Sequence, residues 1–327
     1  MSISSDVILS VRNLEVVYTA KKKIVHAVNG VSFDLRRGET LALVGETGAG
    51  KTTIAKSILR ILPNPPAIVK GGQIIMDNED LLAKPETEML KIRGKKIAMI
   101  FQDPMTALNP LMTVGDQIAE SLLYHTDYDR DTALEKAKEL LEMVGIPGER
   151  YCEYPFQFSG GMKQRVVIAM ALACSPDLLL ADEPTTALDV TIQAQILELI
   201  NKLKQEREMS MILITHDLGV VAQTCDSVAV IYAGKIVEYG DKKSIFLNPA
   251  HPYTIGLFKS IPSLTEDVDK LTPIPGHLPD PTNLPPGCAF HPRCQYCMEK
   301  CRSGEPEYVE VEPGHIVLCK NSEGVKV

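Results

Sequence analysis

Short apolar runs alternate with longer amphipathic segments over the first 240 residues of the chain. Five runs are almost continuously apolar: residues 40–44, 96–101, 177–182, 211–215 and 227–232. Strands of a parallel sheet that is covered by helices on both faces have this pattern, because neither face meets water. The sequence therefore predicts an α/β fold with a mainly parallel sheet.

The sequence also predicts antiparallel strands beside this sheet, an inserted helical subdomain, and an extension after them. Residues 8–18 and 25–35 have the pattern of antiparallel strands beside the main sheet, and residues 113–145 are predicted to be helical, in a subdomain inserted at about 105–175. After residue 240, eight prolines lie between Pro262 and Pro292, which argues against regular helices and central strands there. We therefore expect a domain at 1–240 and an irregular extension at 241–327.

The composition is that of a soluble globular protein and narrows the classes of function. The 327 residues carry 34 Lys and Arg against 42 Asp and Glu, a net charge of −8, which argues against a nucleic-acid-binding protein. No stretch approaches the roughly 20 apolar residues of a membrane span, and the polar N-terminus lacks the apolar core of a signal peptide. We therefore expect a chain in the reducing cytoplasm, where its eight cysteines do not form a disulfide framework.

The run at 40–44 leads into the clearest motif of the chain. Its residues are Gly45, Glu46, Thr47, Gly48, Ala49, Gly50, Lys51 and Thr52, and Thr53 opens a predicted helix. This is G-x-x-x-x-G-K-T between a strand and a helix, the context that a phosphate-binding loop requires. The glycines let N–H groups turn inward around a polyphosphate, and the helix N-terminus adds partial positive charge. Lys51 can reach the β- and γ-phosphates, and Thr52 can ligate Mg²⁺.

A pair of acids adds to the predicted nucleotide site. The run at 177–182 ends in Asp182, and Glu183 follows it. Asp182 at the end of a buried strand can hold the Mg²⁺ shell, and Glu183 can polarise an attacking water as a general base. Two acids after an apolar strand are weak evidence alone, but the phosphate loop favours the catalytic interpretation.

A third motif lies between these two, where residues 158–165 read F-S-G-G-M-K-Q-R. It resembles the L-S-G-G-Q signature of the ATP-binding cassette (ABC) ATPases, with Phe158 in place of Leu and Met162 in place of Gln. The intact core, Ser159, Gly160 and Gly161, presents N–H groups at a helix start, where a phosphate can bind. The resemblance implies that this end serves the nucleotide of an opposite subunit, so that two cassettes enclose two ATP molecules.

Other positions match the same family in order. Gln102 resembles the Q-loop glutamine, which contacts Mg²⁺ and the transmembrane partner, and Ala187-Leu188-Asp189 resembles the D-loop at the dimer interface. His216 resembles the switch histidine at the γ-phosphate, and Tyr18 resembles the aromatic residue that stacks on adenine. The resemblance thus implies a P-loop ATPase that uses ATP and Mg²⁺, with Gln102, Glu183 and His216 in catalysis.

Three further stretches narrow the resemblance to importers of oligopeptides, dipeptides and nickel. They are residues 185–195, 251–257 and 286–294. The D-type ATPase of dipeptide importers is the most similar type, which implies an ATP-hydrolysing subunit on the cytoplasmic face of the cell membrane. Its implied partners are two transmembrane permease subunits, a companion ATPase and an extracytoplasmic peptide-binding protein. Nickel or another small solute as cargo, and a soluble ABC protein that acts on ribosomes or DNA, stay open as alternatives.

Five of the eight cysteines lie close together in the extension, and four thiolates can hold a Zn²⁺ ion or an iron–sulfur cluster. Their spacing alone does not choose between the two. The family resemblance implies a 4Fe–4S cluster on Cys288, Cys294, Cys301 and Cys319. Cys297 is then an additional residue, although its proximity leaves the ligand set open.

Overall fold

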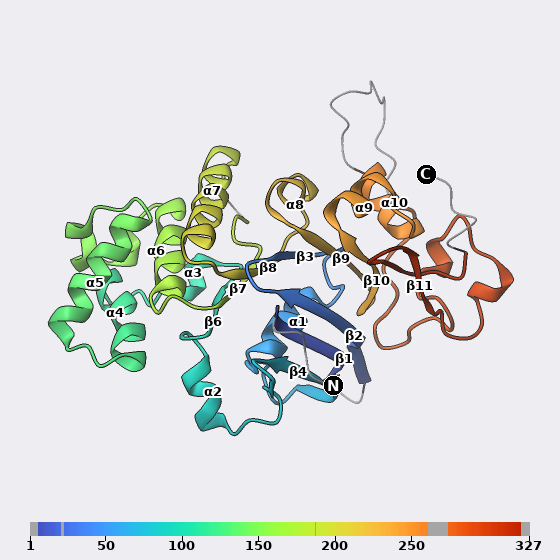
Figure 1. Cartoon of the computed structure of the whole chain (residues 1–327), viewed down its shortest axis with the longest axis horizontal. Helices are drawn as coiled ribbons and strands as arrows, with labels where there is room; N and C mark the ends of the chain where they lie inside the picture. The colour runs from blue at the N-terminus through green and yellow to red at the C-terminus, as the bar shows by residue number, and fades with distance from the viewer. Residues whose placement is uncertain (1–5, 21–22, 187, 261–273, 322–327) are drawn as a thin grey trace. The chain divides into compact units, whose positions relative to one another are not determined.

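The structure, a computed structural model, describes residues 6–20, 23–186, 188–260 and 274–321 (Figure 1). The chain divides into two compact units. Unit 1 consists of residues 1–35, 40–82 and 215–327, and unit 2 of residues 36–39 and 83–214. Among the described residues, no helix is long and apolar enough to cross a membrane.

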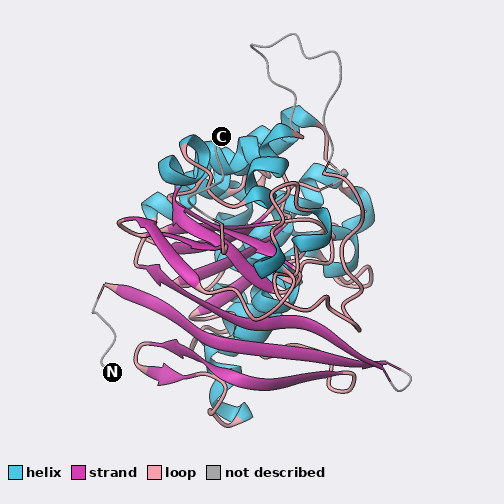
Figure 2. Ribbon diagram, turned by 90° about the vertical axis from the view of Figure 1, so that its right-hand side faces the viewer, coloured by secondary structure: helices cyan, strands magenta, loops and turns pink. Residues whose placement is uncertain are grey.

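Unit 1 contains a four-stranded sheet in the order β2-β1-β4-β5, whose long strands are visible in Figure 2. The strands are β1 (Val7–Ala20), β2 (Lys23–Arg36), β4 (Ala67–Met76) and β5 (Glu79–Asp80). β1 is antiparallel to β4, with Leu9 opposite Met76. The strands predicted at 8–18 and 25–35 beside the main sheet are confirmed, and they form an antiparallel β subdomain. β4 was not predicted, because two adjacent glycines interrupt its apolar pattern.

Five other strands of unit 1 lie in the order β11-β12-β10-β9-β3. They are β3 (Thr40–Val44), β9 (Ser227–Tyr232), β10 (Lys235–Asp241), β11 (Tyr308–Glu312) and β12 (His315–Leu318). β3 and β9 are parallel and fully buried, as the apolar runs predicted, whereas β10, β12 and β11 pair antiparallel. β11 and β12 were not predicted in the extension, because each is short and β11 is exposed along its whole length.

Helices in unit 1 are short. They are α1 (Lys51–Ile58), α8 (Leu218–Thr224), α9 (Lys242–Leu247), α10 (Pro252–Lys259) and the 3₁₀ helices η3 (His291–Arg293) and η4 (Glu299–Cys301). The described part of the proline-rich segment that follows α10, from residue 274, contains no strand and no helix before η3. This agrees with the expectation that proline excludes regular structure there.

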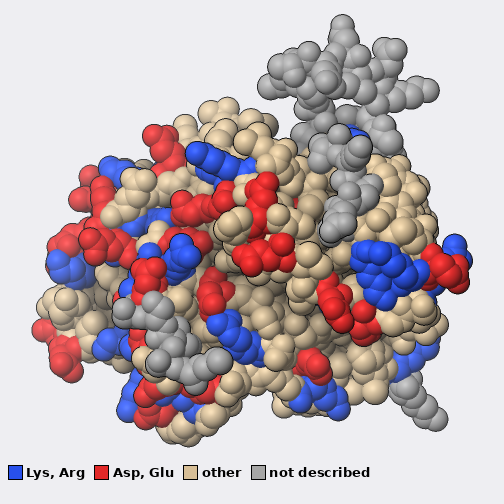
Figure 3. Space-filling view, turned by 45° about the vertical axis from the view of Figure 1, so that its right-hand side comes forward, with Lys and Arg blue, Asp and Glu red and all other residues tan. Residues whose placement is uncertain are grey.

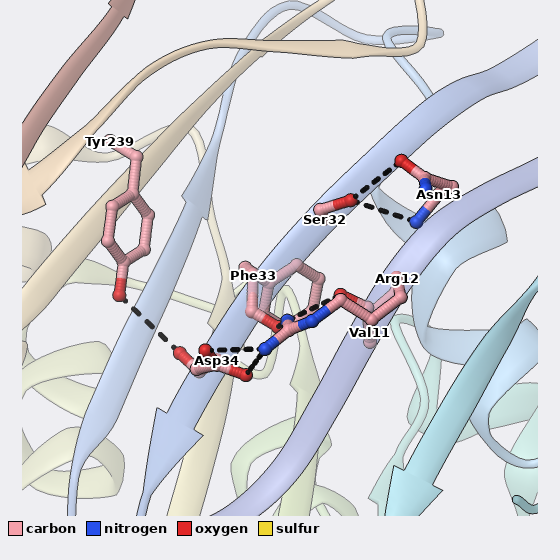
Figure 4. A network of polar contacts seen from close by, with 7 residues as sticks. All are labelled: Val11, Arg12, Asn13, Ser32, Phe33, Asp34 and Tyr239. Atoms are coloured by element: carbon pink, nitrogen blue, oxygen red, sulfur yellow. Dashed lines mark hydrogen bonds and ion pairs between the residues drawn. The ribbon is translucent and has the colours of Figure 1, made fainter. Parts of the chain in front are cut away.

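A polar network connects β1, β2 and β10 within unit 1 (Figure 4). The guanidinium of Arg12 donates to both carboxylate oxygens of Asp34, at 2.7 and 2.8 Å. The hydroxyl of Tyr239 in β10 donates to the Asp34 carbonyl oxygen at 3.4 Å. The N–H of Asn13 donates to the Ser32 hydroxyl at 2.8 Å. Side chains therefore join strands of the two sheets of this unit.

The extension is attached to β10 through the buried carboxylate of Glu238. One of its oxygens accepts a hydrogen bond from the Ala250 N–H at 2.7 Å and lies 2.8 Å from Nε2 of His315; the other accepts from the His251 N–H at 3.0 Å. Glu238 and His315 are both buried. Because a buried carboxylate needs hydrogen-bonding partners, these contacts hold the start of α10 and the strand β12 against β10.

Unit 2 contains three parallel strands in the order β8-β7-β6, namely β6 (Ile97–Ile100), β7 (Leu178–Asp182) and β8 (Ser210–Ile214). All their residues are buried, as the apolar runs predicted. The helices are α2 (Glu86–Ile92), α3 (Pro104–Ala107), α4 (Val114–His125), α5 (Arg130–Met143), η1 (Gly148–Cys152), η2 (Pro155–Gln157), α6 (Gly160–Leu172) and α7 (Val190–Glu206). The predicted helices at 113–145 are α4 and α5, which pack on each other and on α6 (Figure 1).

Charged side chains of both signs are intermixed on the face shown in Figure 3. Acidic residues outnumber basic residues in the sequence, but they do not form one continuous acidic patch on this face. This face therefore offers no continuous basic surface.

Candidate functional site

The phosphate loop, residues 45–52, connects β3 to α1 in unit 1, and close backbone approaches require two of its glycines. A Cβ added to Gly45 would lie 2.2 Å from the carbonyl oxygen of Ile231, and one added to Gly50 would lie 2.4 Å from that of Ala27. Gly50 also has a φ of 107°, which other residues rarely adopt. Contacts that only glycine permits therefore hold the loop against β9 and β2.

The side chain of Lys51, the first residue of α1, folds back into this loop. Its ammonium group donates to the carbonyl oxygens of Gly45 at 2.7 Å and Glu46 at 3.0 Å, and only 6% of the residue is exposed. Thr52 and Thr53 follow in the first turn and are half-buried. A buried ammonium beside a helix N-terminus provides the positive charge that a phosphate requires.

Two other predicted residues of unit 1 lie at the ends of elements. Tyr18 is half-buried near the end of β1, and its hydroxyl lies 3.3 Å from the hydroxyl of Thr53. The structure thus places Tyr18 beside the first turn of α1. His216 is exposed and precedes α8, whose N-terminus is capped by the side chain of Asp217.

In unit 2, the structure brings Gln102 and Glu183 together. Asp182 ends β7 and is 2% exposed, and Glu183 follows with a φ of 46°. Oε2 of Glu183 accepts hydrogen bonds from Nε2 of Gln102 and from the hydroxyl of Thr186, both at 2.9 Å. No role was predicted for Thr186, although it lies in the stretch 185–195 that narrows the family resemblance. Its N–H donates to the Glu183 carbonyl oxygen, which closes a turn after the predicted base.

The signature motif begins α6, as its helix-start interpretation required. The hydroxyl of Ser159 caps this helix by accepting a hydrogen bond from the Met162 N–H at 3.4 Å. A Cβ added to Gly161 would lie 2.8 Å from Cγ2 of Ile192 in α7. Asp189 caps α7 in turn, so the signature and the D-loop residue lie at neighbouring helix starts. Ala187 of the D-loop lies outside the described residues.

Four cysteines of the extension line one small pocket in unit 1. They are Cys288, Cys294, Cys301 and Cys319, the predicted ligands, and Cys297 is not among the lining residues. The Cys288 N–H donates to the Cys301 carbonyl oxygen at 3.0 Å, an approach that Gly287 permits, since a Cβ there would lie 2.5 Å from the same oxygen. Within the described residues, no three Cys, His, Asp or Glu side chains are close enough to share one metal ion as they stand.

Burial governs the chemistry of these thiols. It raises the pKa of Cys294 to about 11 and also raises the pKa values of Cys288 and Cys319, and the neighbouring cysteines add to each of these shifts. Four adjacent thiolates would therefore repel one another unless a cationic group were bound between them. Soft sulfur donors around one pocket suit an iron–sulfur cluster or zinc.

Two residues of the extension for which no role was predicted contact the phosphate loop. The hydroxyl of Tyr253 accepts a hydrogen bond from the Glu46 N–H, and Arg293 forms an ion pair with the Glu46 carboxylate. Hydrogen bonds with Glu46 raise the pKa of Arg293, which stays charged. Both residues lie in stretches that only the family resemblance had singled out. The spacing of residues within a stretch does not predict a contact with a residue so far away in the sequence.

Comparison with protein families gives two matches. The model for the ABC transporter family matches residues 28–186, and that for the oligopeptide/dipeptide transporter C-terminal region matches residues 237–301. The second match ends at Cys301, so it includes three of the four pocket cysteines.

Individual relatives are similar over almost the whole chain. The dipeptide transport ATP-binding protein DppD of Bacillus subtilis is 54% identical over 95% of this chain and 94% of its own. The oligopeptide transport ATP-binding protein OppD of the same organism is 51% identical over 95% of this chain and 87% of its own. Among solved structures, a dimeric ATP-binding cassette, MJ0796, bound to ADP and Pi is 28% identical, with a TM-score of 0.65 over 72% of this chain and 98% of that one.

Proposed function

Because this chain belongs to the ATP-binding proteins of ABC transporters, we propose that it hydrolyses ATP to drive the import of dipeptides or oligopeptides. One observation carries the proposal. The similarity to relatives named for dipeptide and oligopeptide transport extends over 95% of the chain, beyond the common ATPase motifs into the extension. We also propose the division at residue 240, between the ATPase domain at 1–240, with its helical subdomain at about 105–175, and the extension at 241–327.

We assign the nucleotide phosphates to the loop of unit 1, with Lys51 as their main positive charge. Tyr18 stacks on the adenine, and His216 contacts the γ-phosphate. Thr52, Gln102 and Asp182 are assigned to Mg²⁺, whose preference for oxygen ligands their side chains satisfy. Bound there, the ion would neutralise charge on the phosphates.

Glu183 is the proposed general base. Hydrogen bonds from Gln102 and Thr186 to one carboxylate oxygen fix the orientation of the side chain and leave it an acceptor. A carboxylate in this state can take the proton of a water that attacks the γ-phosphate. Thr186 is therefore a positioning residue for this base.

We propose that Ser159, Gly160, Gly161 and Asp189 bind the nucleotide of a second ATPase subunit. Their place at the starts of α6 and α7 supports this, since helix N-termini attract phosphate. The remaining proposed partners are two transmembrane permease subunits and an extracytoplasmic peptide-binding protein, with this chain at the cytoplasmic face of the membrane.

Glu183→Gln tests the catalytic assignment. The amide keeps the shape of the side chain but cannot accept the proton of the water, so ATP hydrolysis should fall by about 10²–10⁴-fold while ATP binding persists. Glu198→Gln, the same change at an exposed position of α7, is the control. Hydrolysis by the Glu183 variant at the control rate, measured in the transporter reconstituted with its permeases, would contradict the base assignment.

For the cysteine pocket we propose a 4Fe–4S cluster on Cys288, Cys294, Cys301 and Cys319. All four line the pocket, and the side chains as they stand are not gathered around one ion. Four sulfur donors suit either zinc or an iron–sulfur cluster, and the family resemblance favours the cluster. When bound, it would tie the loops of the extension together.

Replacing each of these four cysteines singly by Ser should abolish the brown colour of protein purified under anaerobic conditions. Cys297→Ser should leave the colour, because that side chain is outside the pocket. Analysis of iron and sulfide should give about four of each per chain. One zinc per chain in a colourless protein would refute the cluster, and loss of colour in the Cys297 variant would refute the ligand set.

A further inference from the structure

The second residue of the phosphate loop is held by the extension through both its main chain and its side chain. Nη1 and Nη2 of Arg293 donate to the two carboxylate oxygens of Glu46, at 2.7 and 3.0 Å. The Glu46 N–H donates to the hydroxyl of Tyr253 at 2.9 Å. Two parallel charge-assisted hydrogen bonds fix both the distance and the orientation of the carboxylate.

The position of Arg293 is in turn fixed by residues of the extension and of β9. Its Nε donates to the carbonyl oxygen of Pro275 at 2.9 Å, and its guanidinium lies 5.8 Å from the ring centre of Tyr232 and 6.0 Å from that of Phe290. Only 4% of the Arg293 side chain is exposed. The guanidinium therefore cannot follow a moving Glu46 without losing contacts in the extension.

The same segment forms one wall of the cysteine pocket. Phe290 and Cys294 line the pocket, and Cys294 is the residue directly after Arg293. Phe290 also packs against Tyr253, with ring centres 5.5 Å apart. The segment that carries Arg293 is therefore continuous with the wall of the pocket.

Breaking this pair is costly, because Arg293 would keep a buried charge without its partner. The side chain of Glu46 is 31% exposed, so loss of the pair costs less free energy at Glu46 than at the buried Arg293. An energetic linkage between the phosphate loop and the pocket would act equally in both directions.

We infer that Arg293 is a positioning residue for the phosphate loop, and that through Glu46 it couples the state of the four-cysteine pocket to nucleotide affinity. An intact pocket holds the loop in its nucleotide-binding form, and a bound nucleotide protects the pocket. The inference rests on the proposed nucleotide site but not on the identity of the group in the pocket.

A double-mutant cycle on the full chain tests the inference. MgATP dissociation constants are measured for Arg293→Gln, Glu46→Gln and the double variant, at protein concentrations too low for dimers. We expect Arg293→Gln to weaken MgATP binding by about 5- to 30-fold, with no further loss in the double variant. Arg302→Gln, the same change at an exposed position of the extension, should have no effect.

The effect of bound nucleotide on the pocket is measured separately, as the rate at which N-ethylmaleimide modifies the four pocket cysteines. MgATP should slow this rate in the wild type by about the factor found for affinity, and should not slow it in Glu46→Gln. This second variant decides the question if Arg293→Gln fails to fold.

Two results would overturn the inference: a folded Arg293→Gln variant with wild-type affinity, or equal protection of the cysteines in wild type and Glu46→Gln. Lys51→Ala separates this failure from that of the proposed function. If the wild type binds MgATP no better than Lys51→Ala, the nucleotide site itself is wrong. If it binds much better but the cycle shows no coupling, only the role of Arg293 is refuted.

Discussion

Gly48 and Gly50 provide a direct test of how the phosphate loop is held. Both have positive φ, 86° and 107°, but their surroundings differ. A Cβ at Gly48 would meet nothing within 4 Å, whereas one at Gly50 would lie 2.4 Å from the Ala27 carbonyl oxygen. Replacing each glycine by alanine therefore separates the cost of the backbone conformation from the cost of the collision.

The magnitudes follow from these surroundings. A side chain in the left-handed region costs about 1–2 kcal/mol, so Gly48→Ala should lower the free energy of unfolding by about that amount. Gly50→Ala adds a collision with a backbone atom that β2 holds in place. Forced displacement in a packed region costs about 1–3 kcal/mol, so the total should be about 2–5 kcal/mol.

Urea unfolding of both variants and the wild type measures the difference. We expect Gly50→Ala to be less stable than Gly48→Ala by at least about 1 kcal/mol. Equal stabilities would show that the loop does not rest on β2 in the way the structure describes. A Gly50→Ala variant as stable as the wild type would refute the left-handed conformation as well.

Two further predictions concern the signature helix and a buried histidine. Ser159→Arg should leave MgATP binding by the dilute monomer unchanged, because the phosphate loop is in the other unit, but should prevent ATP-dependent dimerisation; loss of affinity in the monomer would contradict the shared-site proposal. His251 is buried and its pKa is lowered to about 4, mainly by desolvation, so the folded state resists its protonation. Its contribution to stability is complete above pH 6.5 and falls by about 3 kcal/mol in total as the pH decreases from 6.5 to 4. Asn can still cap α10, so His251→Asn should flatten the pH dependence of the unfolding free energy in that range, and an unchanged slope would refute the assignment.

The elements that could be predicted are those whose signal is local. β3, β6, β7, β8 and β9 are apolar on both faces, and the phosphate loop is defined by spacing within eight residues. β4 was not predicted because two adjacent glycines interrupt its apolar pattern, and β11 was not predicted because it has only five residues.

Contacts between site residues that lie far apart in the sequence could not be predicted from local patterns. Gln102 and Glu183 are 81 residues apart, and only the order of the family motifs assigned both of them to catalysis. Glu46 and Arg293 are 247 residues apart, and their contact was not expected at all. Such contacts depend on how the elements pack, which no pattern within one element records.

Unit 1 is built from segments that lie before and after unit 2 in the sequence, and this order affects how the protein is synthesised. β3 is complete when residue 44 has been made, but its parallel neighbour β9 begins at Ser227, after all of the segment 83–214 of unit 2. At about 5–20 residues per second, roughly ten to forty seconds separate the two strands on the ribosome. During this interval the edge of the nascent β3 that pairs with β9 is unpaired and is available to chaperones or to other nascent chains. Substitutions that weaken the early segments of unit 1 should therefore lower the yield of folded protein more than they lower the stability of the finished molecule.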